Sequence, residues 1–448
     1  MARRSKTRSL TLWANGIRVG DWQISRRNED VLQYDLEWLA SPQGRALSLS
    51  LPFTADNQPL RGAVVHSYFD NLLPDSEAVR RRLHTRFRTL NTEAFSLLEA
   101  IGRDCVGAIQ LLPDGEAPQG LFEIQTQALS ERQIADTLRA TTAAPAALGQ
   151  HDALDQDFRI SIAGAQEKTA LTLHDGQWCK PIGSTPTTHI FKLPLGLVGG
   201  RQADMSTSVE NEWLCTRLLQ NFDLPTARCT MARFEDQKAL VVERFDRRLS
   251  SERRYWLRLP QEDFCQATGT PPGAKYEADG GPGWVDIAQI LQQSESRKQD
   301  LRTLLLAQLL FWLMAATDGH AKNFSIFLLP GGRYHLTPLY DVLSAWPVTG
   351  TGPNELDRHR LKLAMASRGA NPHYRWKDIQ RRHFNHTARL CGWGTDMEDL
   401  IAEALERLPQ VLAQTQSELT DGFPERIFDS IAEGMTDSAR RLRRMPQD

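Results

Sequence analysis

The chain has 448 residues, a hydrophobic share of 41% and a charged share of 24%, which are typical of a globular protein with two or three subdomains. Its formal net charge of −2 excludes nucleic-acid binding by bulk positive charge, so any contact with DNA needs a local basic patch. The six cysteines show no C-x-x-C spacing, which argues against a zinc site or a disulfide framework and favours a reducing, cytoplasmic compartment.

The N-terminal part is expected to contain a β-hairpin followed by helices. Residues 9–24 alternate between apolar and polar side chains around Asn15 and Gly16, and an Asn-Gly pair in such a run is the strongest short-range signal for a hairpin. Further along, Asp75 or Ser76 is suited to cap a helix that carries several arginines. We therefore predict that residues 1–120 form a mixed α/β N-terminal subdomain.

The middle of the chain is predicted to form a β-rich lobe. Residues 112–155 are rich in Pro, Gly and Ala, which indicates a boundary, and the short β-like segments beyond them are interrupted by one amphipathic helix at residues 208–222. The small residues around Gly164 would let backbone N–H groups approach phosphates closely, although a plain β-turn explains them equally well. We assign residues 121–257 to this lobe.

The last part of the chain, residues 258–448, is predicted to be mainly helical. Residues 304–316 form the longest apolar run, which contains one glutamine and is too short to span a bilayer. This run therefore predicts a buried core helix, and no contact with a membrane is expected. The predicted fold class is α+β, with a two-lobed arrangement and the extra N-terminal subdomain.

Three oxygen-bearing side chains, those of Asp318, Asn323 and Asp341, surround a predicted hairpin. Residues 324–336 have the character of a strand, a Pro-Gly-Gly turn and a returning strand, so Asn323 and Asp341 are expected to lie close together. Carboxylate and carboxamide oxygens suit Mg²⁺, which also binds waters and substrate phosphates. The alternative is that the three residues only cap turns and a helix. Protein kinases have the same order of Asp, Asn, hairpin and metal-binding Asp, which favours phosphoryl transfer.

Kinases also need an upstream lysine on a strand, with a glutamate on the following helix to hold it. Lys192 ends a short apolar strand and is the candidate, although a solvated strand end is the simpler reading of that residue by itself. Glu212 is the expected partner, and Glu210 is its rival because both lie in one helical turn. Glu243 to Phe245 follow a buried strand, where a hinge between lobes would offer backbone groups to an adenine edge.

Several long motifs run from FDNLLPDS in the N-terminal part through THIFKLP to ATDGHAKNFS and LTPLYD around the candidate site. Together they resemble the HipA-type serine/threonine kinases, the toxin half of a bacterial toxin–antitoxin pair. The resemblance covers nearly the whole chain and implies a kinase-like fold, Mg-ATP as donor, and a HipB-like helix-turn-helix antitoxin dimer that holds operator DNA. It also suggests a protein substrate such as an aminoacyl-tRNA synthetase, although no residue of this chain encodes that choice. The motifs are FDNLLPDS, IGRDCVGAIQLLP, ISIAGAQEKTAL, THIFKLP, VVERFDRR, LRLPQED, ATDGHAKNFS and LTPLYD.

The same resemblance implies roles for individual residues. Asp318 would be the general base, Asn323 and Asp341 the metal ligands, and Ser161 a site of inactivating self-phosphorylation. In contrast to common eukaryotic kinases, a histidine follows Asp318 instead of preceding it, so arguments about activation loops do not transfer. The residues implied to bind ATP are Ala163, Gly164, Ala165, Gln166, Glu167, Lys168, Lys192, Glu243, Phe245, His320, Asn323, Tyr340 and Asp341.

Two other interpretations compete with that of a protein kinase. A small-molecule phosphotransferase would use a similar Asp and Asn loop, and a catalytically decayed co-repressor would only bind DNA. The basic stretch at residues 375–389, which interleaves Tyr374 and Trp376 with cations, is the candidate for contact with the DNA backbone, whereas a solvated helix face is its simpler explanation. Its candidate DNA contacts are Arg381, Arg382 and Arg389.

Overall fold

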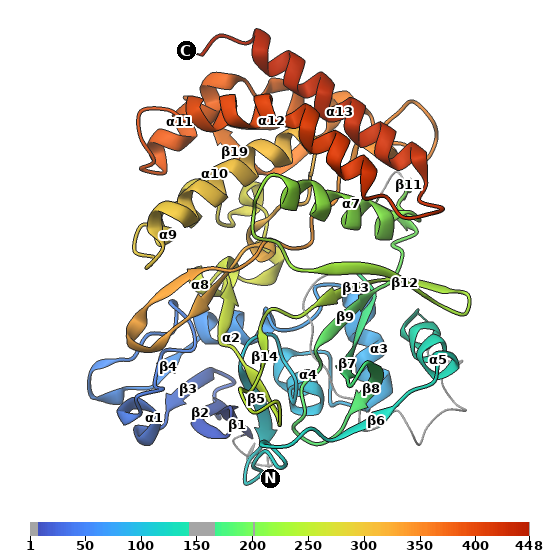
Figure 1. Ribbon diagram of the computed structural model, residues 1–448. Coiled ribbons are helices and arrows are strands. Elements are labelled where there is room, and N and C mark those ends of the chain that lie inside the picture. Colours follow the sequence, from blue (N-terminus) through green and yellow to red (C-terminus); the bar gives the residue numbers. More distant parts are fainter. Residues whose placement is uncertain (1–7, 143–165, 200–201, 448) are drawn as a thin grey trace.

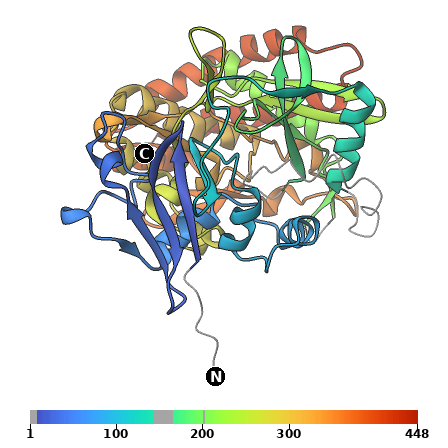
Figure 2. The same cartoon turned by 90° about the horizontal axis from the view of Figure 1, so that it is seen from below.

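The computed structural model describes residues 8–142, 166–199 and 202–447. Ser161 and three residues of the predicted phosphate loop, Ala163 to Ala165, lie outside the described residues. Three regions follow one another along the chain, and the C-terminal helices lie above the strands of the first two regions in Figure 1. Seen from below, the blue N-terminal strands lie beside the green β-rich sheet, with the C-terminal helices behind them (Figure 2).

The N-terminal region is an antiparallel five-stranded sheet in the order β4-β3-β2-β1-β5, covered by helices. The predicted hairpin is present, and Asn15 and Gly16 have φ angles of 47° and 86°, as a tight two-residue turn requires. Trp22 stacks on Phe69 with ring centroids 3.9 Å apart, which fixes α2 on the sheet. The elements are β1 (Arg8–Ala14), β2 (Ile17–Ile24), β3 (Asp30–Tyr34), α1 (Leu36–Ala40), β4 (Leu60–Arg61), α2 (Ala63–Asp70), α3 (Glu77–Phe87), α4 (Ala94–Ile101) and β5 (Ile109–Pro113).

The second region is an antiparallel six-stranded sheet in the order β12-β13-β9-β7-β8-β6. Side chains alternate between its faces with a period of two, so Ala239 and Val241 of β13 join a core with helix α5, while Leu240 and Val242 face α7. The elements are β6 (Thr126–Ala128), α5 (Glu131–Thr142), β7 (Lys168–His174), β8 (Gln177–Pro181), β9 (His189–Lys192), β10 (Leu197–Val198), β11 (Ala203–Asp204), α7 (Ser208–Asn221), β12 (Cys229–Phe234) and β13 (Gln237–Glu243).

The third region is built around α10, the predicted core helix. From Asp300 on, every residue of α10 except Arg302 is buried, because α9, α12 and α13 surround the helix. No described helix is long and apolar enough to cross a membrane. The predicted hairpin is the antiparallel pair β17 and β18. The elements are β14 (Arg247–Leu249), β15 (Trp256–Arg258), β16 (Gln261–Asp263), α8 (Phe264–Thr268), α9 (Trp284–Leu291), α10 (Arg297–Met314), β17 (Ser325–Leu328), β18 (Tyr334–Leu336), β19 (Lys362–Arg368), β20 (Pro372–Arg375), α11 (Arg381–Leu390), α12 (Glu398–Ser417) and α13 (Glu425–Arg444).

Candidate active site

A cleft of about 550 Å³ opens where the three regions meet. Its walls come from the sheet of the second region, from α7, and from the loops around the β17–β18 hairpin. Asp75 and Asn71 of the N-terminal region also reach it. Most of the described residues singled out in the sequence line this cleft: Gln166, Lys168, Lys192, Glu212, Glu243, Phe245, Asp318, His320, Asn323, Tyr340 and Asp341. Glu167 does not, because it pairs with Arg82 of α3.

Lys192 lies at the centre of the cleft between two carboxylates. Its ammonium group is 2.6 Å from Glu212 Oε1 and 2.6 Å from Asp341 Oδ1. The rival residue Glu210 instead contacts Lys238 at 2.5 Å. Two residues apart on a helix point in nearly opposite directions, so the docking of α7 on the sheet selects Glu212.

Burial and ion pairing shift the pKa values of the residues in this cluster in different directions. Burial disfavours the ammonium of Lys192, but the two carboxylates outweigh it and raise the pKa. Burial also raises the pKa of Glu212 to about 7, against the pull of Lys192. For Asp341 the neighbouring cations Lys192 and Lys168 outweigh burial and hold the pKa well below its usual range. Burial lowers the pKa of Lys168 to about 8. Two lysines therefore face one firmly ionised carboxylate, which is an environment that attracts anions.

The segment that carries Asp341 is fastened to α7 through Asn211. The Asn211 amide donates to the backbone oxygen of Ser344 at 2.7 Å and accepts from its N–H at 2.8 Å. Asp341 itself has φ of 62°, in the left-handed region that costs a non-glycine residue some strain. Asn211 escaped the sequence reasoning, although its position next to Glu212 was the available signal.

The loop that carries Asp318 closes on its own backbone. The N–H of His320 donates to the Asp318 carbonyl at 2.8 Å, and the amide nitrogen of Asn323 donates to the same oxygen at 2.9 Å. A Cβ added to Gly319 would lie 2.6 Å from the ring of Phe311, so only glycine lets the loop approach α10 this closely. Asp318 and Asn323 are thus held in a fixed relative position.

The donor set fits a hard divalent cation. Because the amide nitrogen of Asn323 is engaged with Asp318, the side-chain atom left for a ligand is the oxygen, and the firmly ionised Asp341 supplies a carboxylate in the same cleft. Among the described residues no group of three or more His, Cys, Asp or Glu side chains is arranged to hold a metal. Two protein oxygens completed by waters and substrate phosphates are the pattern that Mg²⁺ favours.

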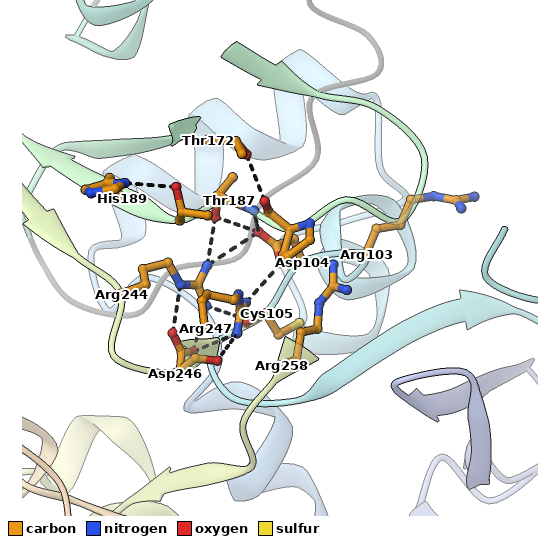
Figure 3. Close-up of polar contacts among 12 residues, drawn as sticks. Arg103, Asp104, Cys105, Thr172, Thr187, His189, Arg244, Asp246, Arg247 and Arg258 are labelled. Carbon is orange, nitrogen blue, oxygen red and sulfur yellow. Dashed lines mark hydrogen bonds and ion pairs between the residues drawn. The ribbon is translucent and has the colours of Figure 1, made fainter. Parts of the chain in front are cut away.

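Phe245 lines the cleft, whereas the side chains of its two neighbours, Arg244 and Asp246, belong to a buried ion network (Figure 3). The guanidinium of Arg244 lies 2.8 Å from Asp246, and Arg247 lies 3.0 Å from Asp104. The ring of Phe245 contacts Tyr340, with centroids 5.7 Å apart. Asp104 belongs to the N-terminal region, so that region directly holds the strand end where the hinge was predicted.

The network is fully enclosed, and its two carboxylates are held in the ionised form. Arg258 adds a third guanidinium 3.3 Å from Asp104, and the hydroxyl of Thr187 donates to the same carboxylate at 2.6 Å. Burial opposes the charge on Asp104, but the three arginines outweigh it and hold the pKa well below its usual range. The second carboxylate, Asp246, also accepts the backbone N–H of Gly107 at 2.7 Å. The sequence reasoning missed this network because its members are far apart along the chain.

A second contact from the N-terminal region reaches the loop that carries Asn323. Asp75 was considered as a helix cap, but Ser76 caps α3 and the Asp75 carboxylate contacts Lys322 at 2.8 Å and Lys275 at 2.9 Å. Burial opposes this charge, yet the two lysines lower the pKa of Asp75 to about 2. The N-terminal region therefore completes the wall of the cleft beside Asn323.

The proposed DNA-contact residues divide into two groups. Trp376 is buried and stacks on Trp312 with centroids 5.4 Å apart, so its assignment to an exposed aromatic and basic patch is wrong. Arg381 forms a largely buried ion pair with Glu398. Arg382 and Arg389 are exposed on α11. The alternation of cationic and aromatic residues in the sequence therefore could not show whether this stretch forms a surface patch or packs on the core.

Comparisons with known proteins identify the family of this chain. The model of the HipA N-terminal domain matches residues 10–112, and that of the HipA-like C-terminal domain matches residues 160–412. A putative kinase of Sinorhizobium fredii is 32% identical over 90% of this chain and 92% of its own length. The serine/threonine-protein kinase toxin HipA of Shewanella oneidensis is 26% identical over 76% of each chain.

The three-dimensional comparison gives the class of fold. A chain from the solved complex of Shewanella oneidensis HipA with HipB and its operator DNA superposes with a TM-score of 0.77, at 22% identity over 97% of both chains. The fold is therefore the two-lobed, kinase-like fold with an extra N-terminal part, and the predicted fold class is confirmed. With both family domains present, the chain belongs to the HipA family, whose named relatives are kinases.

Proposed function

We propose that this protein is a toxin kinase that transfers the γ-phosphate of ATP to a serine or threonine of a protein, with Mg²⁺ bound by Asn323 and Asp341. The observation that carries the proposal is the meeting of Lys192, Glu212 and Asp341 within 2.6 Å contacts in the cleft that also holds Asp318. A purely structural role for these ion pairs would not explain why the Asp318 loop, the β17–β18 hairpin and Asp341 follow one another in the order found in kinases.

In this proposal each residue has a defined task. Asp318 accepts the proton of the acceptor hydroxyl, and Lys192, oriented by Glu212, binds the phosphates together with Lys168. Mg²⁺ would neutralise charge that develops on the transferred phosphoryl group. The base of the nucleotide would lie against Glu243 and Phe245, next to Tyr340, and His320 would lie close to another part of the nucleotide. Gln166 would complete the phosphate loop with Ala163, Gly164 and Ala165, whereas the Glu167 side chain, which pairs with Arg82, would not contact the nucleotide.

The most direct test replaces Asp318 with Asn. Because a general base contributes roughly 10²-fold to 10⁴-fold, phosphate transfer from Mg-[γ-³²P]ATP should fall by about 10² or more while nucleotide affinity measured by calorimetry stays within about twofold. Asp175→Asn, at an exposed aspartate outside the cleft, is the matched control. Near-normal turnover of the Asp318→Asn protein would remove that residue from the role.

Mass spectrometry separates the competing functions. We propose that Ser161 is phosphorylated and that its phosphate switches the enzyme off. A phosphate that carries close to two negative charges would repel the triphosphate of ATP beside it. Wild-type protein incubated with Mg-ATP should gain phosphate on Ser161. A small-molecule phosphotransferase would leave the chain unmodified and consume ATP only with a small acceptor, and a decayed co-repressor would consume none.

The proposed partner is a HipB-like helix-turn-helix antitoxin dimer bound to operator DNA, and the proposed substrate is a translation factor such as an aminoacyl-tRNA synthetase. The Shewanella oneidensis HipA was solved with HipB and operator DNA, which supports the first part. Charge reversal at the exposed Arg382 and Arg389 should then weaken the ternary complex in a gel-shift assay without altering kinase activity. Reversal at Arg381 is unsuitable because it would break the ion pair with Glu398.

A further inference from the structure

A tyrosine that the sequence reasoning did not select contacts the proposed general base. The hydroxyl of Tyr276 donates a hydrogen bond to Oδ1 of Asp318 at 2.6 Å. Hydrogen bonds to an ionised acceptor are roughly twice as strong as neutral ones. The ring of Tyr276 also lies edge-on to His320, with centroids 5.2 Å apart, so the phenol lines the cleft beside the loop that carries Asp318.

The chain is anchored on both sides of Tyr276, and we call residues 275–277 the Tyr276 strap. On one side Lys275 contacts Asp75 of the N-terminal region at 2.9 Å. On the other side the carboxylate of Glu277 accepts the N–H of Ala366 in β19 at 2.6 Å and also pairs with Arg368. The strap is thus joined to two different regions of the protein.

Glycines make this anchoring possible. A Cβ added to Gly283 would lie 2.4 Å from the Glu277 carboxylate, and one added to Gly281 would lie 2.1 Å from the backbone oxygen of Ala274. The N–H of Gly281 also donates to the carbonyl of Tyr276 at 3.0 Å. The loop after the strap therefore packs so closely that the position of the Tyr276 backbone is determined from both directions.

We infer that Tyr276 is a positioning residue that orients the Asp318 carboxylate for the acceptor hydroxyl, an inference that rests on the kinase function proposed above. The phenol binds Oδ1, which leaves Oδ2 to accept the proton of the acceptor. The competing idea is that the phenol occupies the place of the acceptor hydroxyl and must leave before reaction. The anchored strap favours the first idea, because a side chain that must leave is better placed on a segment with fewer fixed contacts.

The test uses the Tyr276→Phe variant, which removes one oxygen atom and keeps the ring. The Asp318→Asn chain, itself inactive, serves as protein acceptor in excess over wild-type, Tyr276→Phe or Tyr255→Phe enzyme, with Mg-[γ-³²P]ATP as donor. Tyr255 lies on the β14–β15 hairpin away from the cleft and is the matched control. Misorientation of a reacting group costs up to about 10²-fold, so kcat should fall by roughly 10-fold to 10²-fold in Tyr276→Phe, with the KM for acceptor and the affinity for Mg-AMPPNP within about twofold.

Each other outcome overturns the inference. A faster reaction or a lower KM for the acceptor chain would identify Tyr276 as a mimic of the acceptor. An unchanged kcat would show that the hydrogen bond has no part in the reaction. A loss of nucleotide affinity and thermal stability in proportion to the loss of rate would assign the phenol a structural role. If the wild-type enzyme places phosphate neither on the acceptor chain nor on its own Ser161, the result would instead contradict the proposed kinase function itself.

Discussion

Two clusters of buried charge lie beside the cleft, and they are built differently. In the arginine network, Arg244, Arg247 and Arg258 surround Asp104 and Asp246, and each of these side chains is at most 9% exposed. In the lysine cluster, Lys192 lies between Glu212 and Asp341, and Asp341 is 29% exposed toward the cleft. The first cluster is closed by protein atoms, whereas the second is open to a ligand.

The difference separates a structural from a functional use of the same kind of interaction. Guanidinium groups satisfy two carboxylates at once through their fixed geometry, so the arginine network holds the N-terminal region against the hinge. The lysine cluster keeps a carboxylate whose pKa burial raises to about 7 and a lysine whose pKa burial lowers to about 8. Shifted pKa values of this kind are typical of sites that bind a charged substrate.

The largest effect is expected from breaking the arginine network at Asp104. Asp104→Ala leaves three guanidiniums with only Asp246, and removal of one partner from a buried ion network costs about 3–5 kcal/mol. Urea unfolding at pH 7 measures the loss, with the exposed Asp175→Ala as control. A change below about 1 kcal/mol in Asp104→Ala would show that the network does not hold the regions together.

The next largest effect is expected at Lys192, where a substitution tests whether the lysine cluster is open to a ligand. Lys192→Met should lower phosphate transfer by about 10² or more, because the phosphates lose their cation. The two carboxylates that Lys192 separated are then left to repel each other, so Mg²⁺ should raise the thermal midpoint of the variant more than that of wild type. Equal Mg²⁺ shifts in the two proteins, measured by calorimetry, would contradict an open site.

Glu262 tests whether a buried carboxylate without an arginine partner resists ionisation, in contrast to Asp104 and Asp246 of the arginine network. It is buried, accepts the N–H of Leu49 at 2.9 Å, and has no hydrogen-bond partner for Oε2 among the described residues. Burial raises its pKa to about 8. Since this lies above the value of about 4.3 in an unfolded chain, its contribution to stability is fully present below about pH 4 and is lost as the pH rises toward 8.

Glu262→Gln should therefore become more stable relative to wild type as the pH rises from 5 to 8, by a few kcal/mol at most. The neutral amide keeps an acceptor for Leu49 and does not titrate. Urea unfolding of both proteins at several pH values measures the difference. A constant difference across this range, or one that grows in the opposite direction, would mean that the folded protein does not resist ionisation of Glu262.

The smallest effect is expected at Glu210, the neighbour of Glu212 on α7. Glu210 is buried, but its partner Lys238 is 28% exposed and water can reach the pair, so we expect a contribution of about 0.2–1 kcal/mol, as for exposed pairs. Glu210→Gln should thus change stability by less than about 1 kcal/mol and leave phosphate transfer unaltered, whereas Glu212→Gln should lower the transfer rate. A kinase assay on the two variants side by side is sufficient, and equal losses would remove the distinction between the two glutamates.

Local sequence determined the elements whose formation depends on neighbours along the chain. The Asn15-Gly16 turn, the buried helix α10 and the β17–β18 hairpin were all predictable, because turn geometry and side-chain periodicity act over a few residues. The same hairpin brings the ends of its two strands together, so the order of Asp318, Asn323 and Asp341 along the chain is enough to indicate a phosphoryl-transfer site.

Tertiary packing decided the contacts between residues that are far apart in sequence. Asp104 meets Arg244 across 140 residues, and Asp75 meets Lys322 across 247, and no local pattern encodes either pairing. Packing also selected Glu212 over Glu210 and buried Trp376, because the face that a helix or loop presents depends on where it docks. The Tyr276 strap belongs to this group as well: its hydroxyl reaches Asp318 only because two distant regions hold the strap in place.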